Sequence, residues 1–296
     1  MAEELLALAV RSSRILRIDI AAATVSTFVA DAGPSPDGIV VADRVYWTTM
    51  GRPTIDPDRP GEQGLDYGAR NGGLHAAELD GTGVHDVADA GTITTGKQLA
   101  LADGWLYWSD REGCQVGRIR PDGSDHQPLV VNQPTPDGTA ECVGVAVDPE
   151  GEWLYWTQKG PAKGGRGRIF RVRLGAPKPA RAEDAELLWD SLPEPIDLEI
   201  HDGWLYWTDR GAEPRGNTLN RAPLPGAGEN GGEVQIRASG FAETIGLALD
   251  PAAGVIYVSD LGGRIRAVPL PRSSATERTV IDLGEPITGI AVVNGR

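Results

Sequence analysis

Cysteine is scarce in this 296-residue sequence, which has only Cys114 and Cys142. Two cysteines cannot build a disulfide framework, and free thiols fit a reducing compartment. No apolar stretch approaches the roughly 18 residues of a membrane-spanning helix, and the opening residues are acidic where a signal peptide is basic. We therefore predict a cytoplasmic protein with no membrane partner.

Basic side chains are also in short supply. The sequence has 28 Lys and Arg against 42 Asp and Glu, which gives a formal net charge of −14. A groove for nucleic acid needs a clustered basic surface, so nucleic acid is not an expected partner. The four histidines form no closely spaced pair, which argues against a histidine-based metal site.

A short repeated unit is the main positive signal. It consists of tyrosine, tryptophan or valine, a hydroxyl residue and a polar residue, and it recurs about every 50 residues. Its copies begin at Tyr46, Tyr107, Tyr155, Tyr206 and Tyr257. Short alternating runs with aromatic anchors and Gly/Asp/Pro turns at this period predict four-stranded blades around an axis. We expect the tryptophans of the unit to pack between blades.

The two ends of the chain predict how the ring closes. Residues 285–296 resemble the first strand of a blade, whereas residues 5–10, 13–19 and 24–30 resemble the second, third and fourth strands of a blade that lacks its first. Joining the ends completes a sixth blade and leaves no free sheet edge at the closure. The prediction is an all-β, six-bladed β-propeller that forms a single domain over residues 1–296.

Longer strings around the repeat carry a resemblance to a known family. They are YWTQKGP at 155–161, GRIFR at 167–171, EPIDLEI at 194–200 and YWTDRG at 206–211. With these strings the chain resembles the YWTD, or LDL-receptor class B, propellers, and in particular an intracellular bacterial and fungal branch that lacks EGF modules. The resemblance implies the propeller fold over essentially the whole chain, and some members of that branch carry dehydrogenase names.

Two loops bear on function. The first, residues 50–70, is much longer than its counterparts in other blades, and it predicts either a lid over the channel mouth or a flexible insertion. The second, Gly226–Gly231, matches a dinucleotide-binding glycine motif, but no strand and helix flank it. We therefore expect no nicotinamide dehydrogenase.

Asp197 and Glu199 are the strongest catalytic candidates. They stand on the innermost strand of blade four, where other blades have small residues such as Gly144 and Ala146. Because strand side chains alternate, both carboxylates should project the same way. They would then serve as a general acid and base, or as oxygen ligands of a divalent cation such as Ca²⁺ or Mg²⁺. The alternative is that an arginine or backbone N–H groups neutralise them.

Other polar residues are expected around the same mouth. Lys159 and Arg168 are candidates for stabilising developing negative charge, as catalytic partners of the two carboxylates. A partial carboxylate ring gives the candidate metal ligands Glu141, Glu194, Asp197 and Glu243. The candidate ligand-binding residues are Gln158, Gln98, Lys97, Asp37 and Asn217.

The aspartate that ends the repeated unit has a structural interpretation. We expect Asp110, Asp209 and Asp260 to form ion pairs between blades. Their partners would be the arginines near the start of the third strands, which are Arg14, Arg118, Arg168 and Arg264.

These features together predict an enzyme that acts on a small-molecule metabolite at the channel mouth without redox chemistry. The reaction would be an isomerisation, elimination, cyclisation or lactone hydrolysis, with no required cofactor and at most a divalent cation. The alternative is an intracellular scaffold that binds a protein or peptide. The oligomeric state is left open.

Overall fold

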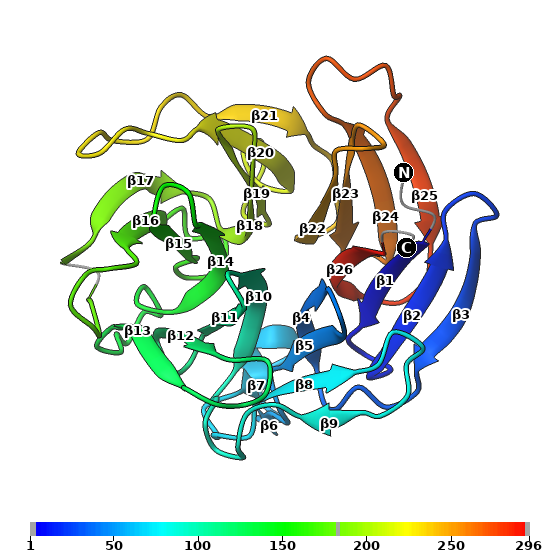
Figure 1. Ribbon diagram of the computed structural model, residues 1–296, viewed down its shortest axis with the longest axis horizontal. Coiled ribbons are helices and arrows are strands. Elements are labelled where there is room, and N and C mark those ends of the chain that lie inside the picture. Colours follow the sequence, from blue (N-terminus) through cyan, green and yellow to red (C-terminus); the bar gives the residue numbers. More distant parts are fainter. Residues whose placement is uncertain (1–3, 182–183, 294–296) are drawn as a thin grey trace.

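The computed structural model describes residues 4–181 and 184–293, and nearly all of them lie in strands, turns and loops. Six antiparallel four-stranded sheets surround a central channel, as Figure 1 shows along the propeller axis. Each sheet is one blade, with its first strand beside the channel and its fourth at the rim. The predicted six-bladed β-propeller is therefore confirmed.

The strand order within each blade runs from the channel to the rim. Blade one contains β4 (Pro36–Val41), β5 (Val45–Thr49), β8 (Gly73–Ala77) and β9 (His85–Asp86). Blade two contains β10 (Gly96–Ala102), β11 (Trp105–Asp110), β12 (Gln115–Ile119) and β13 (Gln127–Val131). Blade three contains β14 (Cys142–Asp148), β15 (Trp153–Gln158), β16 (Gly167–Arg173) and β17 (Glu186–Leu192). Blade four contains β18 (Pro195–His201), β19 (Trp204–Asp209), β20 (Thr218–Pro223) and β21 (Gln235–Ala238). Blade five contains β22 (Thr244–Asp250), β23 (Val255–Asp260), β24 (Arg264–Pro269) and β25 (Arg278–Asp282).

The sixth blade joins the two ends of the chain. Its innermost strand is β26 (Ile287–Val293), and β1 (Glu4–Ala9), β2 (Arg14–Asp19) and β3 (Thr24–Val29) follow outward. Strands β1 and β26 pair antiparallel, with Leu6 opposite Ala291. The closure follows the prediction from the sequence, although the last residues of the predicted strand, 294–296, lie outside the described residues.

The tyrosine and tryptophan of each repeated unit hold neighbouring blades together. Successive strand side chains point to opposite faces of a sheet. In blade four, Trp207 consequently packs against blade three, and Tyr206 packs against blade five. The expected inter-blade position of the tryptophans is confirmed, because the rings of Trp47, Trp108, Trp156 and Trp207 are all fully buried.

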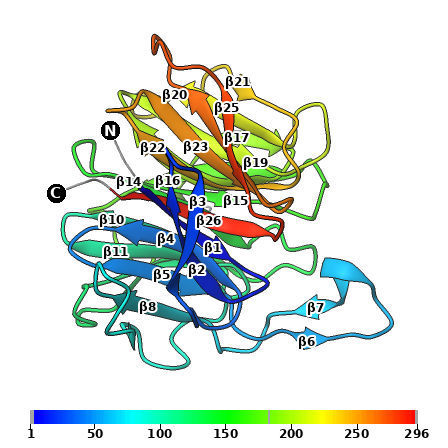
Figure 2. The same cartoon turned by 90° about the vertical axis from the view of Figure 1, so that its right-hand side faces the viewer.

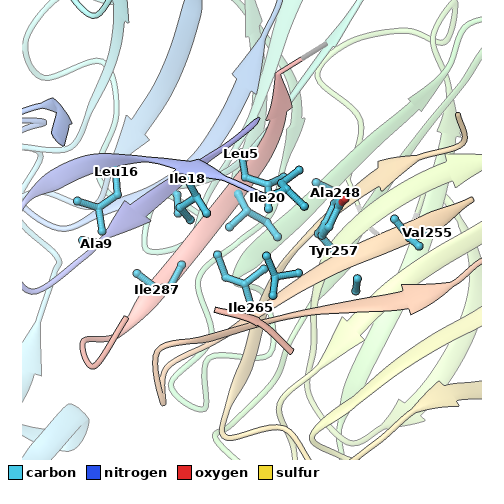
Figure 3. Close-up of a cluster of buried hydrophobic side chains, with 14 residues drawn as sticks. Leu5, Ala9, Leu16, Ile18, Ile20, Ala248, Val255, Tyr257, Ile265 and Ile287 are labelled. Carbon is cyan, nitrogen blue, oxygen red and sulfur yellow. The ribbon is translucent and has the colours of Figure 1, made fainter. Parts of the chain in front are cut away.

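The boundary between blade five and the sixth blade shows how aliphatic side chains complete this core. Leu5, Leu16 and Ile18 of the sixth blade lie against Tyr257 and Ile265 of blade five, as Figure 3 shows. Burial of such side chains contributes about 1.5–3 kcal/mol each. The closure is therefore a packed interface as well as a strand pairing.

Hydroxyl groups of the repeated unit link the innermost strands. Thr157 accepts a hydrogen bond from Gly144 N of its own blade, at 2.7 Å, and donates to the Ile196 carbonyl of the next blade, at 3.0 Å. Thr208 makes the same two bonds, from Asp197 N and to the carbonyl of Ile245. These buried hydroxyls satisfy strand-edge groups that would otherwise lack partners.

The aspartates of the unit are structural, but their partners differ from those expected. Each accepts backbone N–H groups of nearby loops; for Asp110 these include Thr94 and Thr95, at 2.9 and 2.7 Å. Of the four arginines, only Arg264 contacts one of these aspartates within the described residues, and Asp260 belongs to its own blade. The expectation of ion pairs between blades was wrong, because loop N–H groups occupy the carboxylate oxygens.

The long loop of blade one folds as an ordered hairpin. It contains β6 (Thr54–Ile55), the short 3-10 turn η1 (Gly61–Gly64) and β7 (Leu65–Asp66). In Figure 2 the hairpin stands off one face of the propeller instead of lying across the channel. Only its base reaches the mouth, where Tyr67 is buried and its carbonyl accepts from Thr95 Oγ1 at 3.0 Å. The expected lid is thus a projecting arm in this structure.

The hydroxyl link can be tested with Thr157→Val, which keeps the shape of the side chain and removes the hydroxyl. Gly144 N and the carbonyl of Ile196 then lose their partner, and each unsatisfied buried group costs about 1–3 kcal/mol. We expect the free energy of unfolding, measured by urea denaturation, to fall by about 2–4 kcal/mol.

The matched control is Thr157→Ser, because blades two and five carry serine at this position, as Ser109 and Ser259. The serine variant should lose clearly less stability than the valine variant. Equal losses would show that the hydroxyl does not link the blades.

Candidate functional site

A cavity of about 360 Å³ occupies the central channel. All six innermost strands line it, and although most of its lining residues are aliphatic, polar atoms make up most of the surface that faces the cavity. Its polar side chains are Gln98, Asp197 and Glu199. The lining continues to Val41 and Leu249, near the ends of their strands, so the cavity lies in the half of the channel away from the strand starts.

Asp197 stands where neighbouring blades need glycine. A Cβ at Gly144 would lie 2.1 Å from the carbonyl oxygen of Ile196, because the innermost strands approach closely there. Asp197 instead turns its side chain onto the next strand. Its Oδ2 accepts from Leu247 N at 3.0 Å, and its Oδ1 accepts from Leu198 N at 2.9 Å. Both carboxylate oxygens are thereby occupied by backbone donors.

The Glu199 side chain also points toward β22, but only one of its carboxylate oxygens contacts that strand. Its Oε2 accepts from Leu249 N on β22 at 3.2 Å. Within the described residues, Oε1 accepts no hydrogen bond, and the side chain lines the cavity. The two carboxyls therefore connect β18 to β22. The contacts with backbone N–H groups agree with the alternative interpretation from the sequence. Glu199 nevertheless keeps one oxygen that a bound molecule can contact.

Burial changes the protonation of this pair. It raises the pKa of Asp197 to about 7, against the opposing effect of the two backbone N–H groups. It raises the pKa of Glu199 to about 8, and the nearby charge of Asp197 adds to the rise. Two carboxyls with such values hold at least one proton between them at neutral pH.

A second polar cluster lies at the start of the innermost strands and is paired internally. Lys97 Nζ contacts Asp37 Oδ1 at 2.5 Å, and Gln98 Nε2 donates to Asp37 Oδ2 at 3.1 Å. Lys97 also contacts Met50 Sδ at 3.4 Å. Lys97, Gln98 and Asp37 are thus together as expected, but their charges and donors are already engaged with one another.

Glu194 is the centre of the acidic part of this mouth. Its side chain is fully buried, and its Oε1 lies 2.8 Å from Arg210 Nε and 3.6 Å from Lys159 Nζ. Lys159 also lies 4.0 Å from Glu141, while Glu243 pairs with Lys163 at 2.7 Å. Burial lowers the pKa of Lys159, and the charges of its carboxylate neighbours oppose that change.

The predicted catalytic group is therefore divided between two places. Asp197 and Glu199 line the cavity, whereas Lys159 belongs to the cluster at the mouth. Arg168 lies elsewhere again and donates to Gln158 Oε1 at 2.6 Å and to the Thr139 carbonyl at 2.7 Å. Among the described contacts, no hydrogen bond or ion pair joins Lys159 or Arg168 to the two carboxyls.

Asn217 has a local structural contact. Its Oδ1 accepts from Glu243 N at 3.1 Å, and it adopts a left-handed backbone conformation with φ 54°. Asparagine tolerates this conformation better than most residues. This contact supports the loop before β22.

The candidate metal ligands do not form a metal site. In the described part of the chain, no group of three or more His, Cys, Asp or Glu side chains could hold a metal ion. Glu141, Glu194 and Glu243 contact Lys159, Arg210 and Lys163, and Asp197 contacts backbone donors. The carboxylate oxygens of these four residues thus contact basic side chains or backbone N–H groups of the protein itself.

The sequence reasoning missed two arginines of the mouth. Arg111 Nη2 lies 2.6 Å from Glu112 and its guanidinium lies over the Tyr67 ring, 5.3 Å from the centroid. Arg210 lies beside Glu194. The signal was present in the repeat, because Arg111, Lys159 and Arg210 all follow the last residue of a repeated unit.

Comparisons with known proteins agree with this architecture. The fold defines a six-bladed β-propeller of the YWTD type, although no protein-family model matches the chain. The chain belongs to the YWTD (LDL-receptor class B) propeller family. It is 43% identical over 280 residues to "Low-density lipoprotein receptor-related protein 1" of Pyricularia oryzae, across 87% of this chain and 85% of that protein.

A second relative is longer than this chain. "3-hydroxyacyl-CoA dehydrogenase-like protein LAM1" of Cochliobolus heterostrophus is 35% identical over 280 residues, which are 87% of this chain and 56% of that protein. This chain therefore spans little more than half of that relative. None of the helices that the structure describes is long and apolar enough to cross a membrane.

Solved structures share the fold at low identity. The nidogen/laminin complex gives a TM-score of 0.70 at 16% identity, covering 98% of this chain and 97% of that chain. A putative 6-phosphogluconolactonase from Bacteroides uniformis gives 0.58 at 12% identity, covering 94% and 82%. TolB from Acinetobacter baumannii gives 0.64 at 9% identity, covering 97% and 65%. These similarities establish the fold alone.

The mouth cluster can be tested with Glu194→Gln, which removes the buried negative charge beside Lys159 and Arg210. Breaking a buried ion pair by neutralising one partner costs about 3–5 kcal/mol. We expect that loss in the free energy of unfolding measured by urea denaturation. The exposed Glu150→Gln is the control and should stay within about 0.5 kcal/mol. A loss below about 1 kcal/mol for Glu194→Gln would contradict the pairing.

The cavity carboxyls should make stability depend on pH. Their pKa values are raised in the folded protein, so the folded state binds protons more tightly than the unfolded chain. Stability from these groups is greatest near pH 4 and is lost as pH rises toward about 8. Thermal unfolding of Asp197→Asn/Glu199→Gln should show a flatter decline across this window than the wild type. Parallel curves would mean that the two groups titrate normally.

Proposed function

We propose that the protein binds a small molecule in the central cavity and catalyses a non-redox proton transfer on it. The supporting observation is the pair Asp197 and Glu199, two carboxyls that line the cavity and whose pKa values burial raises to about 7 and about 8. Glu199 is the group that exchanges the proton with the ligand, through its Oε1. Asp197 is a positioning residue whose nearby charge adds to the rise in the pKa of Glu199 that burial causes.

The charge of the cavity limits the ligand class. The residues that line it include no lysine or arginine, whereas they include two carboxyls. An anion would meet no opposite charge there, so the ligand is neutral or cationic and small enough for about 360 Å³. General acid–base catalysis by a carboxyl with a pKa near the working pH suits isomerisation, elimination or cyclisation. The proposed site is the central cavity, whereas the sequence predicted a site at the channel mouth.

The experiment combines ligand binding with isotope exchange. Metabolites are first screened by thermal shift, since a ligand that binds the folded state raises its unfolding temperature. Ligands that bind are then incubated with the protein in D₂O and followed by NMR. Wild type should introduce deuterium, and Glu199→Gln should do so at least about 100-fold more slowly. Glu150→Gln should behave like wild type.

Two outcomes would overturn the proposal. One is a ligand whose exchange or turnover is unchanged in both Glu199→Gln and Asp197→Asn. The other is a ligand that binds without changing the pKa of Glu199, because the pKa of a proton-transfer group must change when a ligand contacts it.

A second candidate is a scaffold that contacts a protein partner through the blade-one hairpin. Ile55 and Leu65 form a cross-strand pair at the hairpin, and their side chains are 69% and 36% exposed. Exposed apolar side chains on a projecting hairpin favour a contact with another protein. A pull-down from native cells with wild type and Ile55→Ser/Leu65→Ser distinguishes this candidate, since a partner lost only with the double variant would support it.

A further inference from the structure

A second cavity lies away from the channel, between blades four and five. It holds about 610 Å³, more than the central cavity, and the two share no lining residue. Trp204, Arg221 and His201 line it from blade four, and Arg272 and Ser273 line it from blade five. We refer to it as the blade-four groove.

In the two preceding blades the chain covers the corresponding place with its own segments. The segment that joins the third and fourth strands of blade three runs back to blade two, where Val131 N donates to the Ala180 carbonyl at 2.8 Å and Ala180 N donates to Leu129. The same segment of blade four runs back to blade three, where Gly231 N donates to the Leu188 carbonyl at 2.9 Å. Each segment adds backbone contacts to the outermost strand of the previous blade.

Blade five does not cover blade four in this way. Its connecting segment, residues 270–277, is shorter than residues 174–185 of blade three or 224–234 of blade four. Among the described backbone hydrogen bonds, none joins it to β21. The blade-four groove thus lacks the extended segment that covers blades two and three; the connecting segments of blades one, two and six, residues 78–84, 120–126 and 20–23, are short as well.

Arg221, which lines the groove, has N–H groups that donate to no acceptor within the described residues. In blade three, Arg171 lies over the Trp153 ring and donates to the carbonyls of Pro225 and Gly226, at 2.6 and 2.5 Å. Arg221 has the equivalent place over Trp204, 3.9 Å from the ring centroid, and donates through Nε to Gln235. In the part of the chain that the structure describes, its two Nη atoms contact no acceptor.

The tryptophan beside the groove has one guanidinium over its ring, from Arg221, where its counterparts Trp105 and Trp153 each have two. Arg120 is paired with Trp105 across blade two, 3.7 Å from the ring centroid. Arg173 is opposite Trp153 in blade three, 4.0 Å from the centroid.

In blade four the residue opposite Trp204 is Pro223, which carries no charge. A guanidinium over an indole ring is worth about 0.5–2 kcal/mol. Trp204 therefore has a guanidinium over it from Arg221 alone, and within the described residues no basic side chain fills the place of the second one.

We propose that the blade-four groove binds an extended peptide segment that carries an arginine. Arg221 donates through its Nη atoms to carbonyls of the bound backbone, as Arg171 does to Pro225 and Gly226. The arginine of the peptide stacks on Trp204 in the place of the absent cation, beside Asp202, which also lines the groove. Arg272 on the opposite side excludes a second basic residue nearby by charge repulsion.

The test uses two peptide pools on the immobilised full-length protein. Both are acetylated and amidated pentapeptides with mixed flanking residues, one with arginine fixed at the centre and the other with glutamine. Wild type should retain the arginine pool at least about tenfold more than the glutamine pool, since glutamine cannot make the cation–π contact. Equal retention of the two pools, including no retention of either, would overturn the proposal.

Substitutions at Pro223 provide the matched variants, because this residue is exposed and outside the central cavity. Pro223→Arg supplies the cation that blades two and three have, and should lower retention of the arginine pool at least about tenfold. Pro223→Ala supplies no cation and should retain the pool like wild type. Equal retention by the two variants, with unfolding temperatures that confirm both are folded, would show that Trp204 does not select the arginine.

Discussion

The closest approach between blades depends on a hydroxyl that serves two strands at once. Thr157 and Thr208 each accept from the innermost strand of their own blade and donate to that of the next. This link requires a buried Thr or Ser, and it brings strand backbones so near that a side chain at Gly144 or Gly246 would meet a carbonyl oxygen. Glycine at these positions is therefore a packing requirement.

Blade four has Asp197 at the position of these glycines, and this substitution sets the direction of its two carboxyl side chains. Asp197 cannot project straight at its neighbour, so it turns to accept from β22, and Glu199 repeats this contact two residues further along. The same geometry places both groups in the wall of the central cavity, away from the arginines of the mouth. Burial is the main cause of the rise in both pKa values, and for Asp197 the charge of Lys97 opposes it only in part. Glu194, in contrast, lies in contact with Arg210 and Lys159. The cavity therefore presents carboxyl groups, whereas the polar cluster at the mouth pairs its carboxylates with Lys and Arg side chains.

The repeat made the fold predictable, because periodic strands and a split sixth blade leave few alternative topologies. It also identified Asp197 and Glu199 as departures from the pattern. Their environment was harder to predict, since it depends on the spacing of β18 and β22 and not on the spacing of residues along the chain. Lys159 and Arg168 are close to Asp197 in the repeat, yet their side chains find nearer partners in Glu194 and Gln158. The hairpin at 54–66 was expected over the mouth only because of its length, which says nothing of its direction.

Direct titration of Glu199 tests the central claim, which is that the cavity holds a carboxyl that is protonated near neutral pH. Carbon-13 NMR of the side-chain carboxyls, with Glu199→Gln and Asp197→Asn to assign the signals, measures each midpoint in the folded protein. The account predicts that Glu199 titrates near pH 8 and Asp197 near pH 7. Midpoints near those of unperturbed carboxyls, at about 4, would contradict it.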